Sequence, residues 1–403
     1  MTFTIEPIKP TAAQFGVDFG AMINDLDLEK LTDHDFAKLE EAVYTYQVVV
    51  IRNQSHLTPE TQYKITKMFD PAMDTYGHGG MHRAKASVIA RDLSPLPKVP
   101  QVQLLGNGLI KNYQGISEKL LVHPNHRVFH QTQLSTEEEA AGKTRFYRWH
   151  MDAALYRLNP PKVTSLFGFK NPGTRRQTLQ YDDGSNSEID VQLGTTACKL
   201  IKENDQVALK ILNMKLYRIV ISGQRAFEIL SPELKDFCFR TKVQYAPHPY
   251  LWMSKARSRS TGLGMVSEGK ELSVDELPPI DEKDIKIYPM LWKNPVTNKI
   301  HLQVHPSAVQ DLITDGKRVG DLTKVREILW NIQRPSINPE NVYAHEWKDG
   351  DLVIFHNRGV LHSVVGCLTP DDIRIFQQCN MASSDEPIPV TKEDFAPYAT
   401  VKA

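Results

Sequence analysis

The sequence predicts an α+β fold that is mainly β, a double-sheet jelly roll (double-stranded β-helix) decorated with helices. Short apolar runs of strand length recur between turn signals along most of the chain. Helical periodicity gathers near the N-terminus and in later insertions. A chain of 403 residues has room for two ordinary domains or one large β-rich domain, and we expect a single domain over residues 1–403.

The first elements are expected to be a strand, a helix and a strand within residues 14–53, followed by a second helix. Residues 33–42 carry apolar side chains at helical spacing, and residues 48–51 form a short buried β run. The second helix is predicted to begin at Thr58 and Pro59. A threonine side chain caps a helix start well, and proline is tolerated at the first helical position.

The later elements follow from apolar, β-branched and aromatic runs bounded by turn residues. We expect strands at 100–105, 147–152, 162–170, 286–292, 301–304, 351–355 and 374–379, a hairpin within 173–184, and a helix over 325–333. Residues 117–143 are polar and include an acidic run, so they are expected to form a solvated loop.

The composition excludes several classes of protein. Formal net charge is zero, so nothing in it favours binding to nucleic acid or to an anionic membrane. The four cysteines have spacings that fit neither a zinc site nor a disulfide framework, which favours reduced thiols and a cytoplasmic location. No apolar run approaches the length of a membrane span, and the N-terminus lacks signal-peptide features. A homo-oligomer is left open.

The most informative pattern is the pair His150 and Asp152, taken together with His362. In a strand, residues two apart point to the same face, so one imidazole and one carboxylate can reach a single point. His362 follows the apolar run 352–355. Two histidines and one carboxylate form the facial triad of non-haem Fe(II) oxygenases. With 14 histidines in the chain, a His-x-Asp triplet alone would carry little weight.

Arg374 makes the pattern more specific. It lies twelve residues after His362 in an otherwise apolar stretch. A buried guanidinium needs a carboxylate partner, which it can bind in bidentate fashion. The distal carboxylate of 2-oxoglutarate would be such a partner.

With these residues in place, the chain resembles the TauD-type Fe(II)/2-oxoglutarate-dependent dioxygenases and is most similar to the fungal xanthine dioxygenases of that group. The resembling stretches include 144–161, 243–254 and 343–380. By position, the resemblance implies that His150, Asp152 and His362 hold the iron, and that Arg374 and Thr196 bind 2-oxoglutarate. It also implies that O2 oxidises a purine, xanthine at C8 to uric acid, with release of succinate and CO2.

The substrate pocket is predicted to use amide side chains. Gln101, Gln103, Gln378 and Asn380 each offer a donor and an acceptor, which suits the edge of a purine. Val122 stands where the resemblance leads us to expect a lysine. Two alternatives stay open: the same chemistry on an amino acid or secondary metabolite, or a catalytically silent member that serves as a binding scaffold.

Residues 198–221 depart from the pattern of the family. They lie between a Gly-Thr-Thr motif and Ser222-Gly223, where the resemblance leads us to expect about two residues, and they contain neither glycine nor proline. Our hypothesis is that the segment is a translated, unspliced intron. The alternative is a genuine helical insertion, since loops tolerate added length.

Overall fold

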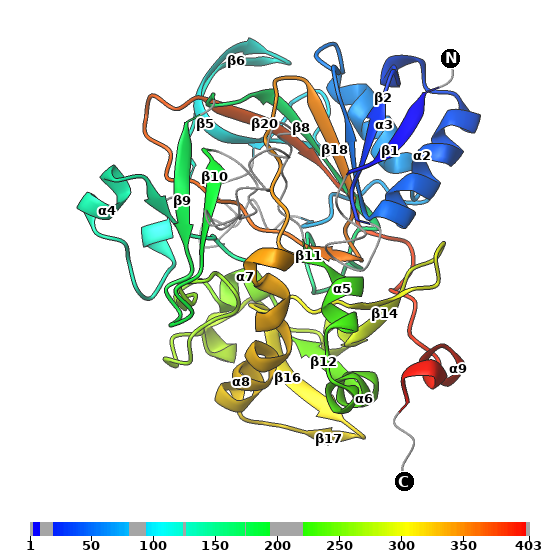
Figure 1. Cartoon of the computed structure of the whole chain (residues 1–403), viewed down its shortest axis with the longest axis vertical. Helices are drawn as coiled ribbons and strands as arrows, with labels where there is room; N and C mark the ends of the chain where they lie inside the picture. Colours follow the sequence, from blue (N-terminus) through cyan, green and yellow to red (C-terminus); the bar gives the residue numbers. More distant parts are fainter. Residues whose placement is uncertain are drawn as a thin grey trace, which may run out of the picture.

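The computed structural model describes residues 3–8, 19–79, 94–123, 126–173, 175–193 and 221–399. A nine-stranded sheet lies in the upper half of the molecule, and most of the later helices lie in the lower half (Figure 1). The mixed α+β composition expected from the sequence is confirmed.

The large sheet contains strands from both ends of the described chain. Its order is β1 (Thr4–Pro7), β2 (Ala21–Asn24), β3 (Val48–Ile51), β18 (Asp351–His356), β8 (Val163–Lys170), β20 (Arg374–Cys379), β5 (Val102–Tyr113) and β4 (Ser94–Pro95), with β6 (Ile116–Leu121) paired to β5. Only the β2–β3 pair is parallel among these strands.

The remaining strands form four smaller sheets. One has the order β10 (Glu188–Gln192), β9 (Arg176–Gln180) and β7 (Lys143–Thr144). A second pairs β11 (Ile221–Ser222) with β19 (Val360–Leu361), and a third pairs β14 (Leu291–Lys293) with β15 (Ile300–Leu302). The fourth has the order β13 (Ile287–Pro289), β12 (Thr241–Tyr245), β16 (Val309–Thr314) and β17 (Lys317–Arg318).

The helices are short and mostly capped by side chains. They are α2 (Asp33–Tyr46), α3 (Pro59–Met68), α4 (Thr136–Ala140), α5 (Gly223–Glu228), α6 (Pro232–Arg240), α7 (Pro249–Trp252), α8 (Leu322–Gln333) and α9 (Lys392–Phe395). The two starts expected near the N-terminus are confirmed, because the Thr32 and Thr58 side chains accept hydrogen bonds from the backbone of α2 and α3.

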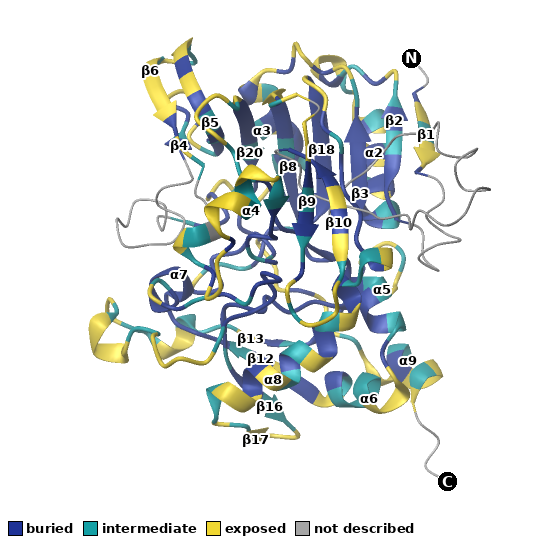
Figure 2. Cartoon of the chain, turned by 60° about the vertical axis from the view of Figure 1, so that its left-hand side comes forward, coloured by how far each residue is buried: buried dark blue, intermediate teal, exposed yellow. Residues whose placement is uncertain are grey.

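Both faces of the large sheet are buried, which explains the continuous apolar runs of its central strands. In β3, Val49 and Ile51 pack in one core cluster with apolar residues of α2 and α3, whereas Val48 and Val50 belong to a cluster on the opposite face. Figure 2 shows these central strands as the most buried part of the sheet. The opposite face also carries Phe355, which leads toward the candidate site.

The hairpin expected within 173–184 extends further, because its two strands β9 and β10 span residues 176–192. Two other expectations from the sequence were wrong. Residues 117–143 are not one solvated loop, because they contain most of β6 and the helix α4. The turn at Gln114 and Gly115, with φ of 47° and 87°, returns the chain into an antiparallel hairpin although β6 is mainly exposed (Figure 2). The capping box of Ser135 and Glu138 starts α4.

The second wrong expectation is the strand over 147–152. Regular pairing is limited to isolated bridges at Phe146 and His150, and the chain leaves the ladder after His150.

Across the part of the chain that the structure describes, every helix is too short or too polar to span a membrane.

A buried charge network holds the start of β18. Asp351 is 1% exposed, and its Oδ2 atom accepts hydrogen bonds from Arg52, from His345 Nε2 at 2.8 Å and from the Lys348 backbone N–H at 2.9 Å. Burial opposes ionisation, but the bonds from His345 and Arg52 outweigh it and hold the pKa of Asp351 below its usual value.

We therefore expect Asp351→Asn to lower the free energy of unfolding by about 3 kcal/mol at pH 7, because it leaves Arg52 partly buried without its charge partner. A carboxylate with a lowered pKa stabilises the fold above its unfolded pKa of about 4, and loses this effect as the pH falls through the folded pKa. Urea unfolding at pH 7 and at about pH 3 should show the difference shrinking at the lower pH.

The neighbouring Asp349→Asn is the matched control for this variant. Asp349 pairs with Lys170 at 2.6 Å, but both side chains are about half exposed. Exposed pairs contribute about 1 kcal/mol or less, so this change should have a small effect. Equal losses in the two variants would contradict the special role of Asp351.

Candidate metal centre

The candidate centre begins with a backbone bridge between two histidines that are far apart in the sequence. His150 N–H donates to the His362 carbonyl at 2.9 Å, and His362 N–H donates to the His150 carbonyl at 2.8 Å. Residues directly opposite in an antiparallel pair place their side chains on the same face. The two imidazole rings accordingly lie 4.1 Å apart between centroids.

Asp152 brings the third donor to the same point. Its Oδ1 atom lies 3.9 Å from His150 Nε2 and 3.8 Å from His362 Nε2. One donor atom from each of the three residues lies within 4.8 Å of the others. Among the described residues, this is the only group of three or more such side chains arranged to hold a metal.

The surrounding residues fix the carboxylate of Asp152. The Asn357 side chain binds the backbone of Asp152. Its Oδ1 atom accepts from the Asp152 N–H at 2.8 Å, and its Nδ2 atom donates to the Asp152 carbonyl at 2.7 Å. Oδ2 accepts from the Thr164 hydroxyl at 2.8 Å and from Gln378 Nε2 at 3.1 Å. The hydrogen bonds therefore occupy one carboxylate oxygen and leave the other, Oδ1, directed at the histidines.

The imidazoles are arranged so that their Nε2 atoms face Asp152. His150 Nδ1 lies 2.7 Å from the Arg148 carbonyl, so it carries the proton and leaves the Nε2 lone pair free for a metal. Burial lowers the pKa of His362 to about 3, so this ring is neutral at physiological pH.

Electrostatics also suit a cation. Burial opposes ionisation of Asp152, but His362, His78, His150 and the Thr164 hydroxyl together hold its pKa below the usual value. The centre thus offers two imidazole nitrogens and one carboxylate, a donor set that fits Fe(II). These three side chains could hold a single non-haem metal ion.

Arg374 lies on the strand that supplies Gln378. Its side chain is fully buried, its Cζ atom lies 4.0 Å from the centre of the Phe376 ring, and burial lowers its pKa to about 10. Arg374 and Gln378 are four residues apart on β20 and so share a face, separated by about 13 Å of strand. The other residue predicted to bind 2-oxoglutarate, Thr196, lies outside the described residues.

The predicted substrate amides are only partly brought together. Gln103 on β5 and Gln378 on β20 are direct cross-strand partners. Asn380 is fully buried just beyond β20, and neither its Nδ2 nor its Oδ1 has a hydrogen-bond partner within the described part of the chain. Gln101 lies outside the strand, with its Nε2 atom 3.5 Å from the Asp74 carbonyl. Val122 is 61% exposed.

The sequence reasoning missed three residues at the centre. His78 Nε2 lies 3.9 Å from Asp152 Oδ1, His305 has its ring 6.2 Å from that of His150, and Asn357 holds Asp152. Asn357 carried a signal, since it sits in the segment 355–362 that leads to His362. His78 and His305 reach the centre from segments with no metal-ligand spacing.

Comparison with known proteins places this centre in a family. The family described as taurine catabolism dioxygenase TauD, TfdA matches residues 218–379. In fold, the chain is similar to AAD-2 in complex with Mn(II) and N-oxalylglycine, with a TM-score of 0.54, 16% identity, and coverage of 96% of this chain and 100% of that one. A taurine dioxygenase from Burkholderia xenovorans gives a TM-score of 0.52 at 17% identity, covering 98% of this chain and 93% of that one.

Several other proteins share a much higher sequence identity with this chain than these solved structures do. The chain is 51% identical to an alpha-ketoglutarate-dependent xanthine dioxygenase of Emericella nidulans, over 96% of this chain and 98% of that protein. It is 49% identical to one of Neurospora crassa, over 97% and 90%, and 46% identical to one of Schizosaccharomyces pombe, over 97% and 91%. The chain belongs to the alpha-ketoglutarate-dependent dioxygenases of the TauD, TfdA family. The family expected from the sequence is confirmed.

Proposed function

We propose that this protein is an Fe(II)- and 2-oxoglutarate-dependent dioxygenase that oxidises xanthine at C8 to uric acid. The cluster of His150, Asp152 and His362 carries the proposal, because its three donor atoms converge on one buried point. The substrate is proposed from the printed activity of relatives that are 46–51% identical over nearly the whole chain.

The overall reaction balances without another reductant. Xanthine, 2-oxoglutarate and O2 give uric acid, succinate and CO2, with one oxygen atom entering the purine and the other entering succinate. Fe(II) bound at the centre supplies the redox chemistry that activates O2. The chain's own part is to hold the reactants: His150, Asp152 and His362 hold the metal, while Asn357 and Thr164 orient the carboxylate.

We assign the cosubstrate to Arg374 and Thr196. A buried guanidinium presents a planar pair of N–H donors that matches the distal carboxylate of 2-oxoglutarate. The position of Arg374 on the same face of β20 as Gln378, which contacts Asp152, supports this assignment.

We assign the purine to the amide side chains near the centre. Asn380 is the strongest of them, because a fully buried amide that lacks hydrogen-bond partners is well suited to a polar ligand. Gln103 has an unpartnered Oε1 atom, whereas Gln378 bonds Asp152 and receives the Tyr76 hydroxyl at 3.3 Å. Gln101 completes the proposed set from outside the strand.

The direct test combines the protein with Fe(II) and 2-oxoglutarate under anaerobic conditions and then adds O2 and xanthine. We expect uric acid and succinate in equal amounts. Succinate without uric acid would keep the chemistry and reject xanthine in favour of an amino acid or a secondary metabolite. If neither product forms, the protein would be a catalytically silent member that serves as a binding scaffold.

We further propose that the architecture is a double-sheet jelly roll within one domain. The bridges Phe146–Val365 and His150–His362 connect segments that follow β7 and β19, which supports joining their two small sheets into the second sheet of a jelly roll. In this arrangement the candidate metal centre lies on the second sheet and Arg374 on the first. An experimental structure in which the two sheets do not face each other would contradict it.

We still propose that the segment 198–221 is a translated, unspliced intron. Residues 198–220 lie outside the described residues, and Ile221 forms the first residue of β11. Sequencing the transcript decides the question, since a message that encodes the whole segment would reject the hypothesis. A cytoplasmic location and the assembly state stay predictions.

A further inference from the structure

His305 is a buried histidine beside the candidate metal centre that the proposed function does not yet use. It follows β15 and is 2% exposed. Its backbone N–H donates to the Tyr245 hydroxyl at 3.3 Å, and its carbonyl accepts from Ala308 N–H at 3.2 Å. The backbone around this residue is therefore held firmly in place, which fixes where the side chain begins.

Among the residues that the structure describes, the ring of His305 has no hydrogen-bond partner. Both Nδ1 and Nε2 are buried and unpartnered. Most buried polar side chains in proteins are hydrogen-bonded, because burial without a partner costs free energy. By contrast, the buried His301 ring bonds the Gly359 carbonyl through Nδ1.

The neighbours of the ring show that it faces the centre. The His305 ring lies 6.2 Å from that of His150 and 6.4 Å from that of Tyr250. Tyr250 in turn lies 5.5 Å from His78, whose Nε2 atom is 3.9 Å from Asp152 Oδ1. His305, Tyr250 and His78 thus form an aromatic wall beside the metal ligands.

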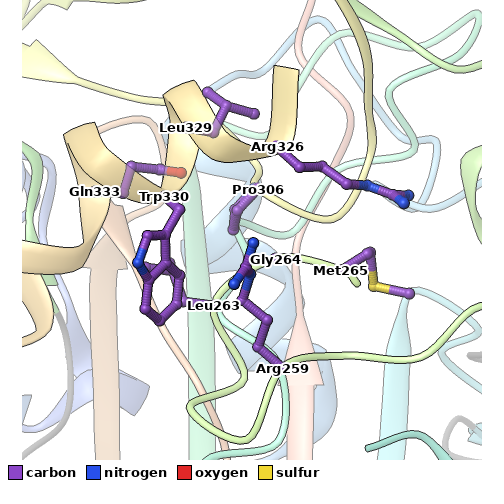
Figure 3. Close-up of a pocket in the computed structure, with 9 residues that line it drawn as sticks. All are labelled: Arg259, Leu263, Gly264, Met265, Pro306, Arg326, Leu329, Trp330 and Gln333. Atoms are coloured by element: carbon purple, nitrogen blue, oxygen red, sulfur yellow. The ribbon is translucent and has the colours of Figure 1, made fainter. Parts of the chain in front are cut away.

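A pocket next to His305 is too small to be the substrate site. Pro306, the next residue, lines a pocket with Arg259 and Trp330 beneath α8 (Figure 3). This pocket encloses about 10 Å³, which is room for roughly one water molecule. A purine does not fit there, so this pocket is not the substrate site.

We propose that His305 binds the substrate directly, as a hydrogen-bonding residue in the wall of the purine site. An imidazole with one proton carries an N–H donor and a lone-pair acceptor on opposite sides of its ring, so one of these atoms can pair with an N–H, carbonyl or ring-nitrogen group of xanthine. The inference rests on the proposed function and adds a specificity-determining residue to it.

The test compares wild-type protein with His305→Leu and His305→Gln. We expect His305→Leu to raise the KM for xanthine about 10- to 100-fold, with the KM for 2-oxoglutarate within about 2-fold. Calorimetric titration of xanthine into the Mn(II) and 2-oxoglutarate form, without O2, should show the same loss of affinity. His305→Gln restores one donor and one acceptor and should recover part of it.

His248→Leu is the matched control, because it removes another buried imidazole, which contacts the Tyr156 ring and the Pro279 carbonyl. It should leave xanthine affinity unchanged. Unchanged affinity in His305→Leu, or an equal loss in both leucine variants, would overturn the assignment of His305 alone. A wild-type protein that turns over 2-oxoglutarate but does not bind xanthine would overturn both this inference and the proposed substrate.

Discussion

Asp152→Asn is expected to abolish metal-dependent turnover while leaving the metal-free protein folded. The side chain keeps its size and can still accept the Thr164 hydroxyl bond, but the negative charge at the point where three donor atoms converge is lost. Changes to residues that merely support ligands cost about 10- to 100-fold in metal affinity or activity, so loss of a ligand charge should exceed about 100-fold.

The stability of the metal-free variant separates this effect from misfolding. Asp152 is 2% exposed, and burial of a carboxylate is costly. Its neighbours nevertheless hold its pKa below the usual value, so we expect the free energy of unfolding of the metal-free Asp152→Asn protein to fall by no more than about 2 kcal/mol. Mn(II) titration by calorimetry measures the affinity, and urea unfolding measures the stability.

Asp70→Asn provides the matched control for this variant. Asp70 is also a buried carboxylate, but it bonds Ser383 and Ser384 and lies 3.4 Å from Lys162. This change should lower stability and leave Mn(II) affinity intact. Wild-type Mn(II) affinity in Asp152→Asn would remove Asp152 from the centre.

The candidate metal ligands could be predicted because their residue types and their positions in the sequence form a recognisable pattern. His150 and Asp152 are two residues apart, and His362 follows a strand whose apolar run is unmistakable. The structural reason predicted for their convergence was nevertheless wrong in part. Residues 147–152 do not form a strand, and His150 meets His362 through a single bridge whose existence depends on the packing of two distant segments.

The wall of the site could not be predicted in the same way. His78 lies in the loop after α3, and His305 follows β15. They come together near Asp152 only because these distant segments pack against each other. Neither residue has a neighbour in sequence that signals a ligand. Their burial became apparent only from the fold, because a histidine in a polar loop and a histidine aimed at a site look alike in sequence.

The fold itself shows the same division. β3 and β20 were predicted at their observed bounds because strands buried on both faces have continuous apolar sequences. β6 was missed because four of its six residues are exposed and polar character suggested a loop. What makes it a strand is pairing with β5 across a tight turn, an interaction that composition does not record.

Arg374→Met is expected to raise the KM for 2-oxoglutarate by about 100-fold or more. Removing one partner of a buried, hydrogen-bonded charge pair costs about 2–5 kcal/mol, which corresponds to roughly 30- to 5,000-fold in affinity. Arg374→Lys should fall between the two proteins, because an ammonium keeps the charge but cannot form the planar bidentate contact.

Arg326→Met is the control for loss of a buried guanidinium. Arg326 is 5% exposed and pairs with Glu271 at 2.5 Å beside α8, so its replacement should lower stability without changing the KM for 2-oxoglutarate. Equal KM changes in the two methionine variants would mean that Arg374 acts through the fold and not through the cosubstrate.

The cosubstrate itself supplies the decisive comparison. 2-Oxobutyrate keeps the keto acid group of 2-oxoglutarate and lacks the distal carboxylate. If Arg374 binds that carboxylate, wild-type protein should strongly prefer 2-oxoglutarate, and Arg374→Met should lose most of the preference because both changes remove the same interaction. Additive losses from the two changes would instead show that Arg374 and the distal carboxylate do not meet, and the anchor would have to be sought on another strand.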